Sequence, residues 1–103
     1  MASRNQDIAT TILSQMGGNR FIAMTGAKHL GFITNGLQFK LPARFAANGI
    51  NCIQVILDPS DTYTMKFLKI RGLDCKKIAE IQGLFFDQLQ EVFTEKTGLN
   101  TSL

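Results

Sequence analysis

Hydrophobic residues recur at helical spacing close to the amino terminus. They lie three or four positions apart and would form one apolar stripe on a helix over residues 4–16: Ile8, Ile12, Leu13 and Met16. Ser3, with Gln6 three residues later, has the pattern of a capping box, which indicates the start of this helix. Gly17-Gly18 predicts its end, because glycine adopts the left-handed cap conformation at little cost.

A second apolar stripe near the carboxyl end predicts a helix over residues 84–97. The stripe consists of Phe85, Phe86, Leu89, Val92 and Phe93. The opposite side of this helix carries Gln88, Gln90, Glu91 and Glu95. Gly98 follows directly and is expected to cap the helix.

The chain between these helices changes to patterns that are typical of strands. Residues 37–41 alternate strictly between apolar and polar side chains, which indicates a strand with one buried face. Residues 52–57 form the most β-prone run and are expected at the centre of the sheet. We also predict strands over residues 20–25, an apolar run between glycines, and over residues 63–71, which follow a turn at 58–61.

A fifth strand and an irregular register are also expected. Residues 75–82 fit either a helix or a short edge strand, and we favour the strand. The alternation of residues 63–71 is interrupted at Phe67-Leu68, where a β-bulge would account for the slip. The chain is therefore predicted to be a single α+β domain over residues 1–103. Its antiparallel sheet of four to five strands would carry an N-terminal and a C-terminal helix on one face, in the order α-β-β-β-β-α.

The composition agrees with a folded domain. The 103 residues are 45% hydrophobic and 18% charged, which is ordinary for a globular protein. The sequence has no apolar run of membrane-spanning length, and its first residues lack the apolar core of a signal peptide. We therefore expect a cytoplasmic protein with no membrane contact. Cys52 and Cys75 are then expected to be small buried apolar residues and not a disulfide.

Candidate catalytic groups are few. His29 is the only histidine, and nothing in the spacing pairs it with Cys52 or Cys75 as a nucleophile and its base. These three residues contain no close pair of the kind that starts a zinc site. Glu91 and Glu95 share one helix face, but that face is opposite the apolar stripe and is expected to be solvated. We therefore predict a non-enzymatic protein with no catalytic residues, metal or cofactor.

The net charge of +3 is unevenly distributed. Residues 20–77 carry nine basic and three acidic side chains, a net charge of +6, whereas residues 78–103 carry one basic and four acidic ones, a net charge of −3. Such asymmetry can attract a polyanion to one face, or can match charges within the molecule. The candidate binding residues are Lys28, Lys66, Lys69, Arg71, Lys76 and Lys77.

The faces on which these cations lie decide between two functions. Strand alternation places Lys69 and Arg71 on one face, and Lys66 joins them only if the strand bulges. Converging cations would favour a nucleic-acid binding module that uses a basic sheet face. Lysines spread along a strand would instead be a solvated surface that discourages edge pairing.

The segment around Lys28 suggests a third function. Thr25-Gly26-Ala27-Lys28-His29 is basic and contains glycine, but it lacks the spacing of a phosphate-binding loop. We expect a loop or a bulged continuation of the preceding strand at residues 26–31. A small-nucleotide binding protein would need a concave pocket close to residues 26–29.

Three segments resemble small uncharacterised proteins encoded by bacteriophages and mobile genetic elements. They are residues 18–28, Phe39-Lys40-Leu41-Pro42 and residues 89–99. The resemblance covers most of the chain and brings with it no established activity and no functional residue. It implies a phage or prophage context, in which small basic proteins often act by binding host machinery.

The leading expectation is therefore a non-enzymatic binding protein that acts on a host protein or complex, for example as an inhibitor of a host defence system. It would work in the cytoplasm of the host cell. A homodimer is expected if the uncovered sheet face is apolar, through Ile22, Met24, Cys52 or Ile56.

Overall fold

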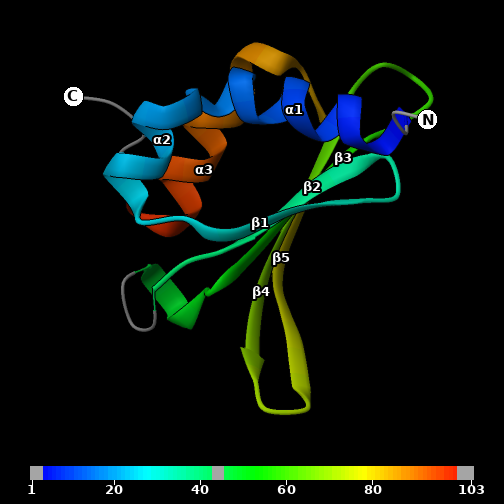
Figure 1. The fold of residues 1–103 in the computed structure, drawn as a ribbon. Helices are drawn as coiled ribbons and strands as arrows, with labels where there is room; N and C mark the ends of the chain where they lie inside the picture. Colours follow the sequence, from blue (N-terminus) through cyan, green and yellow to red (C-terminus); the bar gives the residue numbers. More distant parts are fainter. Residues whose placement is uncertain (1–3, 43–45, 100–103) are drawn as a thin grey trace.

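The chain folds as an α+β domain with a five-stranded antiparallel sheet and its helices on one face (Figure 1). The computed structural model describes residues 4–42 and 46–99. The strands are β1 (Lys28–Ile33), β2 (Gly36–Lys40), β3 (Cys52–Leu57), β4 (Tyr63–Arg71) and β5 (Asp74–Leu84). The helices are α1 (Arg4–Met16), α2 (Gly18–Thr25) and α3 (Leu89–Thr97), with short 3₁₀ turns η1 (Ala47–Gly49) and η2 (Phe86–Gln88). Neighbouring strands in the chain are also neighbours in the sheet, in the order β1-β2-β3-β4-β5.

Both terminal helices form, and the first has the predicted bounds. The expected cap Ser3 lies outside the described residues. Helix α3 is shorter than predicted, because the chain first makes the turn η2 and becomes α-helical only at Leu89. Gly98 caps it in the left-handed conformation, at φ 76°, and its N–H donates to the carbonyl of Thr94 at 2.8 Å.

Residues 20–25 were predicted as a strand, and this prediction is wrong. They belong to helix α2, whose buried residues Phe21 and Thr25 are four positions apart and therefore share a helix face. Gly17, at φ 122°, separates α2 from α1, and Gly26 caps α2 in the left-handed conformation. A short apolar run is compatible with both a buried strand and a buried helix. The glycines on either side of residues 20–25 were interpreted as strand boundaries, whereas they are the boundaries of a helix. The first strand is consequently β1, in the segment expected to be a loop or a bulged continuation of the preceding strand.

The other strand predictions are confirmed, including the favoured strand at residues 75–82, which is part of β5. The expected bulge also exists, although the extra residue lies in the neighbouring strand. Phe67 pairs with Ala79 and Leu68 with Lys77, so Ile78 of β5 is the residue without a partner in β4. Strand β4 itself therefore keeps its alternation.

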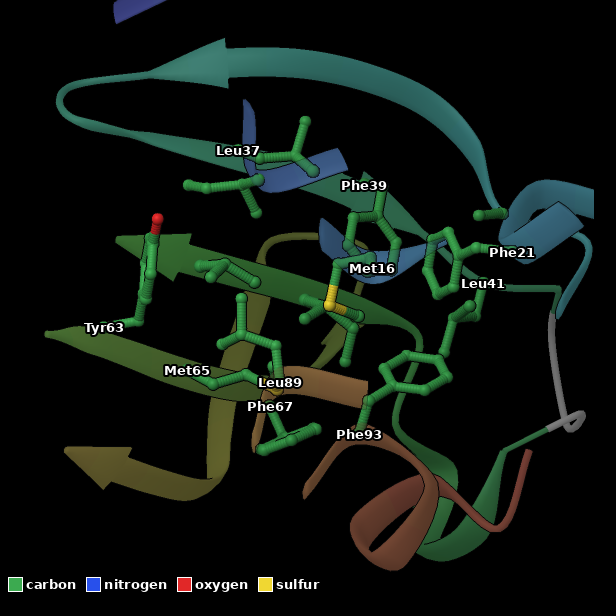
Figure 2. Close-up of a cluster of buried hydrophobic side chains, with 14 of the residues drawn as sticks. Met16, Phe21, Leu37, Phe39, Leu41, Tyr63, Met65, Phe67, Leu89 and Phe93 are labelled. Atoms are coloured by element: carbon green, nitrogen blue, oxygen red, sulfur yellow. The ribbon is translucent and has the colours of Figure 1, made fainter. Parts of the chain in front are cut away.

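One hydrophobic core lies between the sheet and the helices (Figure 2). Its aromatic centre consists of Phe21 from α2, Phe39 from β2 and Phe93 from α3, each with no exposed surface. The Phe21 ring lies edge-on to the other two, at centroid distances of 5.2 Å. The surrounding core residues include Ile12, Met16, Leu37, Leu41, Ile50, Ile53, Val55, Tyr63, Met65, Phe67 and Leu89.

Candidate functional site

The sheet face that points away from the helices is called the open face here. Leu37, Phe39, Ile53 and Val55 point into the core, so the residues that alternate with them in β2 and β3 point the other way. Cross-strand pairing continues this face into β4 and β5. The open face thus carries Gln38, Lys40, Cys52, Gln54, Lys66, Leu68, Lys77 and Glu80.

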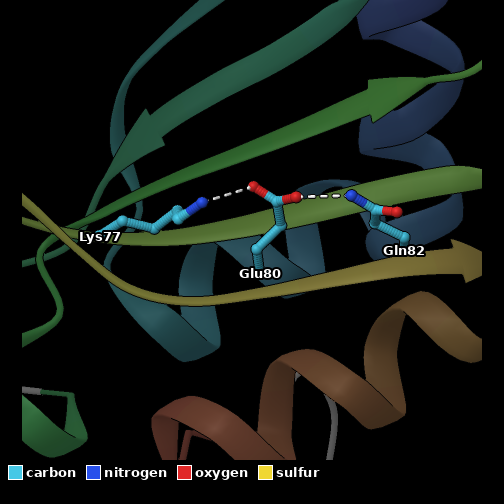
Figure 3. A network of polar contacts seen from close by, with 3 residues as sticks. All are labelled: Lys77, Glu80 and Gln82. Carbon is cyan, nitrogen blue, oxygen red and sulfur yellow. Dashed lines mark hydrogen bonds and ion pairs between the residues drawn. The ribbon is translucent and has the colours of Figure 1, made fainter.

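Part of the open face is a neutralised polar surface. Glu80 makes an ion pair with Lys77 at 3.0 Å and accepts a hydrogen bond from Gln82 at 2.6 Å (Figure 3). The hydrogen bond from Gln82, followed by that from Lys77, lowers the pKa of Glu80 below its ordinary value. Gln54 donates to Gln38 at 2.7 Å across β2 and β3. Lys77 is therefore already paired with an anion within the domain.

The predicted basic residues do not share one face. Because β4 alternates regularly, Lys66 points to the open face and Lys69 and Arg71 point to the other. Lys76 pairs with Lys69 and therefore lies beside it. Lys28, Lys66 and Lys77 thus belong to the open face, and Lys69, Arg71 and Lys76 form a second group.

This second group lies on a projecting hairpin. The ladder between β3 and β4 ends at Cys52 and Leu68, so residues 69–76 pair mainly with one another; they are called the β4–β5 hairpin here. Figure 1 shows this hairpin extending beyond the rest of the sheet. Its tip is the two-residue turn Gly72-Leu73, with Gly72 at φ 56° as the tight turn requires.

Two residues that the sequence analysis did not single out define the hairpin. Leu73 stands at the tip with a relative exposure of 105%, so it contacts essentially nothing in the domain. Asn51 holds the base: its side chain donates to the carbonyl of Ile70 and accepts from the N–H of Ile70, both at 2.8 Å. The amide of Asn51 thereby imitates one more residue of β3 and supports the hairpin where the β3 ladder has ended.

A hollow of about 270 Å³ lies where β1, β2 and the base of the hairpin meet. Its lining consists of Lys28, His29, Lys40, Leu41, Asn51 and Ile70. Lys28 and Lys40 are direct cross-strand partners. His29 has a positive φ of 54°, and the β1 register slips between Lys28 and Gly31. The concave pocket that a small-nucleotide binding protein would need is therefore present beside residues 26–29.

The two cysteines differ, and the expectation that both are buried is wrong for Cys75. Both are free thiols; Cys52 is buried and Cys75 is exposed. Burial raises the pKa of Cys52, opposed in part by the charge of Lys40, while Cys75 adds a smaller increase. Cys52 is thus kept as the protonated and weakly nucleophilic form.

We expect Ellman's reagent at neutral pH to label one thiol rapidly and the other only on unfolding. The fast thiol is Cys75, because Cys52 is covered and its raised pKa leaves little thiolate. The absorbance trace of the native protein should show one equivalent, and the urea-unfolded protein two. Cys75→Ser should remove the fast phase, and rapid labelling of that variant would contradict the burial of Cys52.

Two kinds of site can be assessed directly from the described residues: metal sites and membrane-spanning helices. Within residues 4–42 and 46–99, no three His, Cys, Asp or Glu side chains are grouped so that they could hold a metal ion. None of the helices in that same part of the chain has the length and apolar character to span a bilayer. Glu91 and Glu95 are both exposed on α3. The open face, the hairpin and the hollow are the features considered below for binding.

Comparisons with known proteins do not add an identity. No family model matches the chain, and neither the curated proteins nor the solved structures contain a significant match. We therefore infer the function from the geometry described above.

Proposed function

We propose that this protein is a non-enzymatic binding protein that docks on another protein through the β4–β5 hairpin. The observation that carries the proposal is the projecting basic hairpin with a fully exposed leucine at its tip. Single exposed apolar residues are common on folded monomers, and Phe32, Phe85 and Phe86 are exposed here as well. Leu73 differs from them because it stands at the end of a projecting basic hairpin, where a partner can reach it. With the phage resemblance, the partner is a host protein or complex, and inhibition of a host defence system is the role that we propose.

The hairpin is built to bind without much reorganisation. Its strands are held by a two-residue turn at the tip and by the two Asn51 hydrogen bonds at the base. A preorganised loop loses less conformational entropy on binding, so more of its contact energy appears as affinity. Leu73 can then fill an apolar pocket of the partner while Arg71 contacts the rim of that pocket.

Charge selects the kind of partner surface. Lys69, Arg71 and Lys76 lie on one face of the hairpin, and Asp74, the Cα partner of Arg71, is the single acidic residue there. Lys69 and Lys76 face each other as like charges, which is unfavourable unless an anionic group lies between them. The matching surface is an apolar pocket with acidic residues around it. A second copy of this chain is a poor match, because two basic hairpins would repel each other.

Nucleic acid is the less favoured partner. Site-specific complexes with strong salt dependence make about 6–10 phosphate contacts, whereas three cations share the hairpin face. Lys28, Lys66 and Lys77 lie on the opposite side of the sheet. Residues 69–76 contain no aromatic side chain on which a base could stack. A tip leucine adds nothing to phosphate binding.

Site-directed crosslinking tests the proposal. A maleimide photocrosslinker attached to the exposed Cys75 lies close to the tip and would capture whatever the hairpin contacts in a host extract. The captured partner is then purified, and its Kd for the uncrosslinked protein is measured. Leu73→Asp should raise that Kd by about 30-fold, because truncating a central apolar anchor typically weakens binding by about 2 kcal/mol.

The matched control places the same charge on another turn. Thr34→Asp changes an exposed residue at the tip of the β1–β2 turn and should leave the Kd unaltered. Neither substitution should lower stability, since Leu73 has no contacts to lose. Crosslinking to nucleic acid alone, or equal affinity of the Leu73→Asp and Thr34→Asp variants, would refute docking through the hairpin. A concentration-dependent homodimer lost with Leu73→Asp would make a second copy the partner instead.

A further inference from the structure

We propose that the hollow at Lys28, His29 and Lys40 binds a small ligand through a single phosphate group. The site is separate from the tip of the β4–β5 hairpin and does not depend on the protein-docking proposal. Three features of the hollow support it: a bulge that brings Lys28 and His29 together, a pair of lysines with no counter-ion among the described residues, and a fixed amide donor beside apolar lining residues.

The bulge in β1 brings two consecutive polar side chains to one place. In a regular strand Lys28 and His29 would point to opposite faces of the sheet. Here the register slips between Lys28 and Gly31, His29 adopts a φ of 54°, and both residues line the hollow. Bulges commonly re-aim side chains next to functional sites, and positive φ is uncommon outside glycine. The local backbone therefore brings the Lys28 ammonium group and the His29 ring to the same hollow.

Neither lysine of the hollow has a counter-ion among the described residues. Lys28 and Lys40 are Cα partners across β1 and β2, an arrangement in which like charges repel. Among the described side chains, the ion pair within 4.0 Å is that between Lys77 and Glu80, which leaves both hollow lysines without one. An anion bound between Lys28 and Lys40 would turn this repulsion into attraction.

Asn51 supplies a hydrogen-bond donor with a fixed orientation, and the apolar residues of the lining lower the local polarity. One N–H of the Asn51 amide is used on the carbonyl of Ile70 at 2.8 Å, and the same nitrogen carries a second N–H. The amide cannot rotate freely because its oxygen accepts from Ile70 as well. Leu41 and Ile70 provide apolar lining, where charge-assisted hydrogen bonds are stronger than in open water.

The size of the hollow limits the ligand. Its volume of about 270 Å³ lies just below the range of about 300–1,000 Å³ that is typical of sites that enclose a drug-sized molecule. One phosphate group and part of what it is attached to would fit, whereas a polynucleotide would not be enclosed. The ligand class is therefore a small phosphate monoester, and a nucleoside monophosphate is the natural first probe.

Two-dimensional NMR of the ¹⁵N-labelled protein tests this site directly. Titration with inorganic phosphate, with AMP and with a short single-stranded oligonucleotide should be compared. We expect saturable shifts of the backbone amides of residues 28–31 and of the Asn51 side-chain NH₂ signals with phosphate and with AMP. The double variant Lys28→Gln/Lys40→Gln should raise the Kd for AMP by about tenfold or more, because two charge-assisted contacts are lost.

The control removes equal charge elsewhere. Lys66→Gln/Lys76→Gln takes two cations from the sheet outside the hollow and should change the Kd little, because exposed charges at a distance are screened by salt. All four positions are on the strand surface, so both double variants should remain folded, as their spectra will show. Equal weakening by the two doubles, or no saturable shift at Asn51, would overturn the site. Preferential oligonucleotide binding at the hairpin lysines would overturn it in favour of a nucleic-acid surface.

Discussion

Replacing Phe93 with alanine is expected to lower the free energy of unfolding by about 3–5 kcal/mol. The Phe93 side chain has no exposed surface, and its ring lies 5.2 Å from that of Phe21 and 6.2 Å from that of Phe39. These three rings join α2, β2 and α3, so the cavity cannot close without moving an element that other contacts hold. The loss therefore includes the transfer free energy, the cavity and the edge-to-face contact.

The measurement is urea unfolding followed by circular dichroism, with thermal unfolding beside it. Domains of this size are stable by about 5–15 kcal/mol, so the variant would lose a large part of its stability. Its Tm should fall by at least about 12 °C, because 1 kcal/mol corresponds to about 4–8 °C here. Phe86→Ala is the control, since that side chain is 61% exposed and should change stability by about 0.5 kcal/mol or less. Equal effects would contradict the aromatic centre described above.

The terminal helices were predictable because their stripes and glycine caps agree with each other. The stripe of Ile8, Ile12, Leu13 and Met16 and the following glycines give the bounds of α1 correctly. Residues 20–25 were assigned incorrectly because six residues are too few to show a helical period. Whether such a run is a helix or a strand depends on what it packs against, and Phe21 packs in the aromatic core as part of α2.

The candidate surfaces were predictable only in part. The basic residues of the hairpin can be identified in the sequence. The face of the sheet to which each of them points depends on which strand contains the bulge. A slip at Phe67-Leu68 was expected, and its position in β5 keeps Lys66 apart from Lys69. Homodimerisation was expected through an apolar sheet face that included Ile22 and Met24. These two residues lie in α2 and not in the sheet, so they do not contribute to that face.

The hollow and the tip leucine had no clear signal in the sequence. In the sequence, Leu73 is one apolar residue of a short connection between two strands. Its exposure arises because the hairpin extends past the end of β3. Lys40 lies twelve positions from Lys28, and only antiparallel pairing of β1 with β2 brings them face to face. Asn51 acquires its role because β3 begins only at Cys52, two residues short of the position that would pair with Ile70 in this register. Such juxtapositions come from register, which composition and local spacing do not specify.

Gly36 offers the sharpest test of that register. An Asn-Gly pair such as Asn35-Gly36 is typical of the centre of a tight turn. Here the positive φ belongs to Asn35 alone, and Gly36 is the first residue of β2, paired with Ile33 and Ile56. A Cβ added to Gly36 would collide with the carbonyl oxygen of Val55 and come within 3.1 Å of the Ile56 Cα. Glycine is thus required there by the close approach of β3 and not by turn geometry.

We therefore expect Gly36→Ala to lower the free energy of unfolding by up to about 3 kcal/mol, because the colliding atoms belong to backbone and cannot rotate away. Gly31→Ala in β1 is the matched control: nothing lies within 4 Å of its added Cβ, and its φ is not positive. That variant should instead be stabilised by about 0.4–1 kcal/mol, because alanine has fewer unfolded conformations to lose. Urea unfolding of both variants measures the difference, and its sign is the decisive result. A Gly36→Ala variant as stable as Gly31→Ala would mean that β2 and β3 do not approach in this register, and the positions of Lys40 and Cys52 on the open face would then have to be reassigned.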